Sequence, residues 1–236
     1  MMGCVAAIRV LTYNIRSLRD DPRAVGRVIR SLEPDVACIQ EAPRFWRWRT
    51  KCRRLAADAT MTWTCGGRDS GANIVLTSLR IDTIATRSVL FSKDPRLHQR
   101  GTALAVLRID SALFAVAGIH LDGVEQPRLR HIDELHRAID VFVPTGAPVI
   151  VAGDVNDVPG SRSWDALCAR GTDAFAVAGS GAGETSNVTR RSRRIDAVFT
   201  GPDVTVRSAA AVASDDVMVA SDHFPVVCEL EIPGHR

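Results

Sequence analysis

Short apolar runs, separated by stretches with helical periodicity, dominate the chain. The predicted strands are 9–13, 36–39, 74–76, 81–90, 103–109, 113–119, 149–152, 195–199, 204–212 and 225–232. The predicted helices, with apolar residues three and four positions apart, are 20–32, 45–59, 127–142 and 161–170. Many strands with few helices favour two sheets packed together with helices outside.

Length and composition fit a packed α/β protein. The 236 residues are 46% hydrophobic, and no clear linker divides them, so we expect one domain over 1–236. No apolar run approaches the roughly 20 residues of a membrane span, and the start does not resemble a secretory leader. We therefore expect a cytoplasmic monomer without a transmembrane segment. The six cysteines lack metal-ligand spacing and are expected to be free thiols.

The net charge excludes few classes of binding partner. A formal net charge of +3 permits an anionic substrate but does not demand a nucleic-acid groove. The basic residues are almost all arginine, which suits phosphate recognition. A GC-rich genome explains the same bias equally well.

Six of the predicted strands begin or end with polar residues of one chemical kind. These are carboxylates, amides and imidazoles, at Asn14, Gln40-Glu41, His120, Asp154-Val155-Asn156, Asp196 and Asp222-His223. Any one of them is also explained as turn chemistry. Together they are the hard oxygen ligands and imidazoles of a magnesium-type site that acts on phosphate. Asp154 and Asn156 are two residues apart, so in an extended stretch their side chains face the same way.

These motifs, in their order and spacing, resemble the endonuclease/exonuclease/phosphatase superfamily with the deoxyribonuclease-I-like fold. The matching segments are Thr12-Tyr13-Asn14-Ile15, Ile39-Gln40-Glu41, Gly118-Ile119-His120-Leu121, Gly153-Asp154-Val155-Asn156-Asp157, Arg194 to Phe199 and Ser221 to Val226. The resemblance implies an α/β fold, a four-layer α-β-β-α sandwich of two mainly antiparallel sheets, with the site at one edge. It also implies Mg²⁺- or Mn²⁺-dependent hydrolysis of a phosphoester by in-line attack of water.

The resemblance assigns three residues to the metal. Glu41 corresponds to the principal metal carboxylate, and Asn14 lies beside it, directly or through water. Asp222 completes the metal shell in this assignment, although a loop carboxylate that accepts backbone N–H groups is the alternative.

The resemblance assigns five residues to catalysis. Asp154 orients or deprotonates the attacking water, and Asn156 donates to the phosphoryl oxygens. His223 binds the phosphate oxygen, and Asp196 holds the imidazole of His223 in the required tautomer. His120 contacts the phosphate or protonates the leaving oxygen, with a structural histidine as the alternative.

Three further residues are candidates for substrate binding. Asn73 precedes a strand where many relatives have Gly-Asn, and an ordinary strand-start asparagine explains it equally. Arg100 occupies a similar position before residues 102–104. Arg194 belongs to a basic loop that either recognises phosphate or is simply solvated.

The choice of substrate rests on weaker signals. One tyrosine and few aromatics that look exposed give base stacking little support, so nucleic acid is possible but not favoured. A small-molecule or lipid-headgroup phosphoester is the favoured substrate. The alternatives are a DNA endonuclease or exonuclease of the base-excision repair type, and a non-catalytic relative that binds phosphate or a partner.

Overall fold

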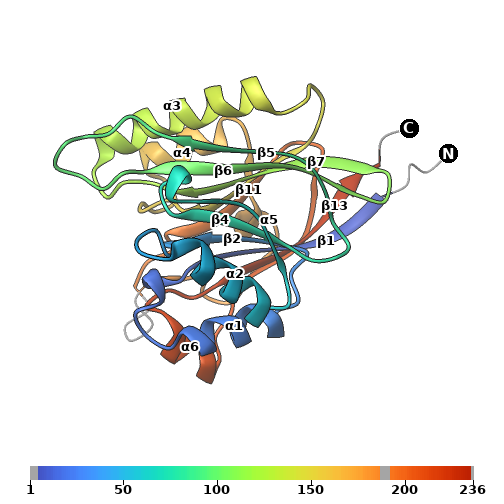
Figure 1. Ribbon diagram of the computed structural model, residues 1–236. Helices are drawn as coiled ribbons and strands as arrows, with labels where there is room; N and C mark the ends of the chain where they lie inside the picture. Colours follow the sequence, from blue (N-terminus) through green and yellow to red (C-terminus); the bar gives the residue numbers. More distant parts are fainter. Residues whose placement is uncertain (1–4, 187–191, 235–236) are drawn as a thin grey trace.

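The computed structural model describes residues 5–186 and 192–234, which form two β-sheets packed face to face between helices (Figure 1). Helices α3 (Glu125–Phe142) and α4 (Arg162–Cys168) cover one sheet. Helices α1 (Pro22–Ser31), α2 (Trp48–Asp58) and α6 (Asp215–Ala220) cover the other. The expected four-layer sandwich is therefore confirmed.

Both sheets are mixed but mainly antiparallel. The seven-stranded sheet has the order β10 (Gly179–Ser180), β12 (Thr205–Ala211), β13 (Val226–Pro233), β1 (Val5–Asn14), β2 (Val36–Gln40), β4 (Asn73–Thr77), β3 (Thr62–Gly67). The six-stranded sheet has the order β5 (Asp82–Leu90), β6 (Gly101–Ile109), β7 (Ala112–His120), β8 (Val149–Asp154), β11 (Asp196–Thr200), β9 (Thr172–Asp173). Only β1–β2, β7–β8 and β10–β12 pair in parallel within the described residues. The remaining helical elements are η1 (Arg16–Leu18), η2 (Arg68–Ser70) and α5 (Ala174–Ala178).

Side chains alternate between two cores along each central strand. In β1, Val10 packs between the two sheets, whereas Leu11 packs under the helices. In β8, Ala152 faces the space between the sheets, whereas Val151 faces the helices. Because the alternation has a period of two, the residues that continue the inner column at the strand ends also face the space between the sheets.

Strand direction brings the polar ends to one edge of the sandwich. β7 and β8 are parallel, so their last residues, His120 and Asp154, are partners in the register. β11 runs antiparallel to β8, and its first residue, Asp196, is therefore also paired with Asp154. In the other sheet Asn14 is paired with Gln40 at the ends of parallel β1 and β2. This common edge holds the candidate site.

Three elements differ from the sequence-based expectation. The helix expected over 45–59 begins only at Trp48, because Arg47 has a left-handed backbone (φ 54°). Strand β3 is an addition to the expected strands, since Thr62–Gly67 is short and glycine-ended. Helix α6 is a further addition, although the Ser214 hydroxyl accepts from the Val217 N–H as an N-cap should.

Two simpler expectations concern membranes and cysteines. None of the helices in the part of the chain that the structure describes is long and apolar enough to cross a membrane. The five described cysteines are free, at 38, 52, 65, 168 and 228, and Cys4 lies outside the described residues. The absence of a disulfide framework among the described cysteines is thus confirmed.

Two buried glycines on β7 and β8 provide a matched test of the packing. A Cβ on Gly153 would lie 1.9 Å from the backbone oxygen of Ile119, whereas a Cβ on Gly118 would meet nothing closer than 3.6 Å. Gly153→Ala should therefore lower the free energy of unfolding by about 3 kcal/mol or more, and Gly118→Ala by much less. Urea denaturation of both variants measures the difference, and equal stabilities would contradict this packing.

Candidate active site

A hydrogen bond between the two sheets lies at the centre of the site. The amide Nδ2 of Asn14, at the end of β1, donates to Asp154 Oδ2 at 3.0 Å. The same amide group donates to Glu41 Oε1 at 3.4 Å. Its Oδ1 accepts from the Arg16 N–H at 3.0 Å, which fixes the orientation of the amide. Asn14 thus joins a carboxylate from each side of the sandwich.

The backbone turns sharply at two of the site residues. Glu41 and Asn156 have positive φ angles of 53° and 56°, which side-chain-bearing residues rarely adopt. Such a conformation costs on the order of 1–3 kcal/mol and persists where surrounding contacts hold it. At Asn156 one such contact is the bond from its N–H to Asp154 Oδ1 at 2.9 Å.

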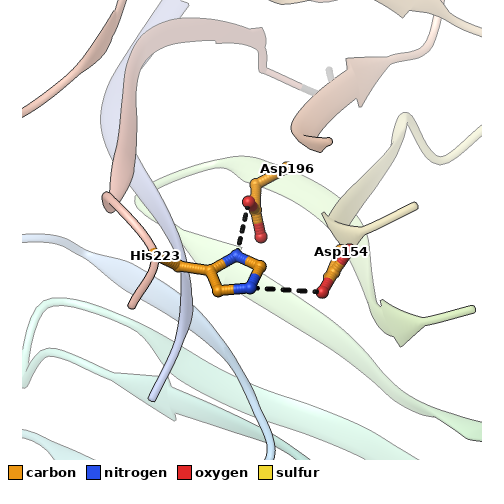
Figure 2. A group of neighbouring side chains, drawn as sticks. All are labelled: Asp154, Asp196 and His223. Carbon is orange, nitrogen blue, oxygen red and sulfur yellow. Dashed lines mark hydrogen bonds and ion pairs between the residues drawn. The ribbon is translucent and has the colours of Figure 1, made fainter. Parts of the chain in front are cut away.

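The imidazole of His223 lies between two aspartates (Figure 2). Its Nδ1 is 2.8 Å from Asp196 Oδ2, and its Nε2 is 4.0 Å from Asp154 Oδ2. Burial alone would lower the pKa of His223, but the charge and hydrogen bond of Asp196, with Asp154, outweigh burial and raise it well above its ordinary value. His223 is therefore an imidazolium at neutral pH, with its Nε2–H close to Asp154.

Asp154 itself is almost fully buried. Burial raises the pKa of its carboxyl, and the charge of Asp196 raises it further, whereas His223 and the bond from Asn14 oppose the rise. A carboxylate whose proton affinity is raised in this way is suited to take a proton from water.

His120 is the neutral counterpart of His223. Burial lowers its pKa well below the ordinary value, and the charges of Arg100, His223 and Arg44 lower it further. Its Nε2 lies 3.1 Å from the Nδ2 of Asn156 and 3.4 Å from Asp154 Oδ2. Asn156 also donates to the Leu121 oxygen at 2.9 Å. His120 therefore orients Asn156.

A buried arginine outside the sequence-predicted set supports the turn after β8. Arg128, on α3, donates to the backbone oxygens of Asp122 and Asn156 at 2.7 and 3.3 Å. It also donates to Ser163 Oγ at 2.7 Å and forms an ion pair with Asp157. In sequence Arg128 looks like one of many surface arginines on an amphipathic helix. The Asp157 carboxylate three residues after Asp154 is the only signal in the sequence that could have pointed to it.

Of the expected substrate residues, Arg100 lies near the site. Burial lowers the pKa of its guanidinium, while the charges of Asp122, Asp154 and Glu41 oppose this. Its Nε is buried without a hydrogen-bond partner among the described residues and lies 3.7 Å from Asp122 Oδ2. The neighbouring Arg44, which sequence reasoning did not single out, influences the pKa of both Arg100 and His120.

Arg194 is occupied elsewhere. Its two terminal nitrogens donate to the two carboxylate oxygens of Asp173 at 3.0 and 2.7 Å. Its guanidinium also lies over the rings of Trp164 and Phe175, at 4.7 and 5.0 Å from their centroids. The Arg194 guanidinium is therefore paired and stacked in this structure, and its role in substrate binding stays a prediction.

Asn73 and Asp222 also serve other contacts. The Asn73 amide donates to the Ser70 and Gly101 oxygens at 2.8 and 3.0 Å, so it links β4 to β6 in the other sheet. The Asp222 carboxylate is 3.3 Å from Arg16 Nε and is half exposed. The Asp222 carboxylate thus has Arg16 as its partner here, and its place in a metal shell stays a prediction.

The oxygen ligand atoms gathered at this edge of the sheets suit a hard divalent cation. Ligand atoms of Asp154, Asp196 and His223 lie within 4.8 Å of one another among the described residues, but His223 as an imidazolium has no lone pair for a cation, so only the carboxylates of this cluster remain as ligands. The buried Oδ1 of Asp196 has no hydrogen-bond partner in the described part of the chain. Glu41 adds a half-buried carboxylate on the Asn14 side. Carboxylate and amide oxygens are the ligands that Mg²⁺ and Mn²⁺ prefer.

The fold, and the position of the candidate site at one edge of the two sheets, agree with the family resemblance that the sequence motifs indicated. The profile of the Endonuclease/Exonuclease/phosphatase family matches residues 11–223, and the chain belongs to that family. Members of the family are hydrolases that act on phosphoester bonds. No curated protein matches the chain.

Solved structures share the fold over nearly the whole chain. An endonuclease/exonuclease/phosphatase from Bacteroides vulgatus has a TM-score of 0.81 at 20% identity, covering 96% of this chain and 99% of that one. A mannosyl-6-phosphatase from Bacteroides thetaiotaomicron has 0.80 at 16%, covering 94% and 99%. TDP2 from D. rerio, in complex with a single strand DNA product, has 0.72 at 17%, covering 95% and 99%.

Removal of the Arg128 side-chain charge tests its positioning role. Arg128→Met leaves the Asp157 carboxylate and two backbone oxygens without their donor, so we expect a loss of about 3 kcal/mol of unfolding free energy. The turnover number should also fall, since the Asn156 turn loses its anchor. Arg130→Met, on the exposed side of the same helix, is the matched control. Denaturation and steady-state kinetics that do not separate the two variants would contradict the role.

The opposite charge states of the two site histidines predict a pH dependence. In metal-free buffer His223 should remain protonated above pH 7, and Asp196→Asn should lower its pKa by about one unit or more. The contribution of protonated His223 to the free energy of unfolding is fully present at pH values below its ordinary pKa. This contribution is lost as the pH rises through the raised pKa of the folded protein. NMR titration measures both pKa values. His136, whose pKa burial lowers, should titrate identically in the two proteins. Wild-type His223 titrating near its ordinary pKa of about 6.5 would contradict the assignment.

Proposed function

We propose that the protein hydrolyses a phosphoester with water as the nucleophile and with a divalent cation, Mg²⁺ or Mn²⁺, at the shared edge of the two sheets. The observation that carries the proposal is the Asn14–Asp154 bond, since it brings the Glu41 side and the Asp154–His223 side of the site together. A non-catalytic role is disfavoured because Glu41, Asp154 and His223, whose loss would indicate it, are all present.

The cation would be held chiefly by Glu41, with Asn14 beside it. When bound, it neutralises phosphate charge and polarises the P–O bond.

The chain's own residues divide the remaining tasks. Asp154 accepts a proton from the attacking water, because its buried carboxyl has a raised pKa. The imidazolium of His223 donates its Nε2–H to a phosphoryl oxygen and stabilises the charge that develops there. Asp196 keeps His223 charged and correctly oriented. The charge of the Arg100 guanidinium, which acts on His120 in the site, would add to the attraction for phosphate. Water attacks in line, the P–O bond to the ester oxygen opposite it breaks, and that oxygen leaves as an alcohol after taking a proton from solvent, so configuration at phosphorus inverts.

Hydrolysis of bis-p-nitrophenyl phosphate and p-nitrophenyl phosphate tests the proposal. Activity should disappear with EDTA and return with Mg²⁺ or Mn²⁺, and Asp154→Ala should reduce kcat by about 10²- to 10⁴-fold. Glu41→Ala should instead shift the metal titration to higher concentration, because it removes a cation ligand rather than the base.

Two results would count against the proposal in different ways. Full activity in EDTA would remove the cation. Undiminished kcat for Asp154→Ala, with its circular dichroism spectrum unchanged, would remove Asp154 as the base. The ratio of diester to monoester turnover also decides between a phosphodiesterase and a phosphatase. For the phosphodiesterase outcome, a chiral labelled phosphate reports inversion or retention.

A further inference from the structure

A strongly basic and aromatic segment follows Glu41 directly. Between residues 42 and 57 the chain carries no acidic residue and six basic ones, at 44, 47, 49, 51, 53 and 54. The same segment holds Phe45, Trp46 and Trp48. Phe45 and Trp46 are 77% and 76% exposed. The helix expected over 45–59 would contain these two rings, but they lie in the exposed turn before α2.

An arginine guanidinium lies over each aromatic ring of this segment and over the nearby ring of Trp63. Arg44 lies over Phe45 and Arg47 over Trp46, with the guanidinium 5.3 and 5.2 Å from the ring centroid. The same arrangement pairs Arg49 with Trp48 at 4.3 Å and Arg53 with Trp63 at 5.7 Å. Within the described residues Arg47, Arg49 and Arg53 form no ion pair with an acidic group. Their charges therefore remain available to an anionic partner.

The surface continues into a groove of about 700 Å³ between α2 and the edge of β3. Trp48 and Trp63 pack edge to face there, with centroids 5.6 Å apart. The groove is lined further by Arg49 and Arg53, and its one acidic lining residue among those described is Asp69. We call the set Arg44–Arg49, Arg53 and Trp63 the aromatic–arginine surface.

This surface borders the candidate active site. The segment is tied beside it, since the Ala42 N–H donates to the Ala72 oxygen at 2.8 Å. The charge of Arg44, at the start of the surface, acts on His120 and Arg100 within the site. A chain bound along the surface would thus have a phosphate group near the reacting centre.

We propose that the aromatic–arginine surface binds single-stranded nucleic acid and delivers it to the neighbouring site. Its alternation of ring and cation matches a polymer in which flat bases alternate with phosphates. Base–aromatic stacking is tolerant of sequence, and arginines beside the rings contact the backbone. The binding surface is independent of catalysis, but its use in substrate capture rests on the proposed phosphoesterase function.

A bilayer fits the same residues less well. A helix or loop that enters a membrane interface presents bare apolar side chains on one face and keeps its charges on the opposite face. Here a guanidinium lies against each of the two exposed rings, so burying Phe45 or Trp46 in lipid would carry Arg44 or Arg47 with it.

Fluorescence anisotropy with a labelled oligothymidylate, in EDTA so that hydrolysis does not interfere, measures the binding. The double variant Phe45→Ala with Trp46→Ala should raise Kd about tenfold or more, and folding is not at risk because both rings are exposed. Leu79→Ala is the matched control, since Leu79 is 94% exposed and lies at the opposite end of β4 from Asn73. Its Kd should equal that of the wild type.

The salt dependence gives a second reading. Arg47→Ala should reduce the slope of log K against log salt by about 0.7, because one arginine then no longer neutralises a phosphate of the single strand. Arg207→Ala, on β12 and paired with Glu231, should leave the slope unchanged.

Several outcomes would overturn the inference. They are an unchanged Kd in the double variant, binding of duplex as tight as of single strands, or binding of phosphatidylserine vesicles without any of the oligonucleotide. The Phe45→Ala, Trp46→Ala double variant separates this inference from the proposed function, because it should still hydrolyse p-nitrophenyl phosphate like the wild type while its oligonucleotide binding is weakened. Wild-type protein that binds the oligonucleotide but hydrolyses no ester supports the surface and contradicts the activity. Ester hydrolysis without oligonucleotide binding supports the proposed activity and contradicts the inference about the surface.

Discussion

The hydrogen bond from Asn14 to Asp154 is the contact on which the arrangement of the site depends. It joins the last residues of two strands that belong to different sheets, at the point where the apolar core between the sheets ends. A hydrogen bond to a buried carboxylate is worth about 1.5–3 kcal/mol, and leaving either group unpaired there would cost more. Asp154 in turn is paired in register with Asp196 and His120. One interaction thus sets the position of residues from both halves of the molecule.

Much of this was predictable because strands alternate with a period of two. The column that includes Ala6, Ile8 and Val10 continues to Asn14, and the column that includes Ala152 continues to Asp154. Periodicity predicted the strands and their polar ends, and the resemblance to the family then implied that these ends meet at one edge of the two sheets. The elements around the site follow from local chemistry as well, as at Asp21-Pro22, where the aspartate caps α1.

The features that could not be predicted depend on partners distant in sequence. Arg128 looks like a solvated helix residue until Asp157 and the Asn156 backbone fold against it. Arg194 looks like a phosphate ligand until Asp173 is found beside it. Phe45 and Trp46 look like helix residues until the left-handed backbone of Arg47 ends the turn. In each case composition supplies the charge or ring, and only the tertiary structure decides whether it is used internally or remains exposed.

The link between the sheets has a thermodynamic consequence. Residues that would hold a cation or phosphate come from both sheets, so such a ligand binds only when the sheets are packed together. Its binding free energy is then added to the free energy of folding, and the gain grows with ligand concentration. Conversely, any substitution in the core that lets the sheets separate, even one far from the edge, weakens binding by the same coupling. The packing of the two sheets and the binding of a ligand at their edge are therefore thermodynamically linked.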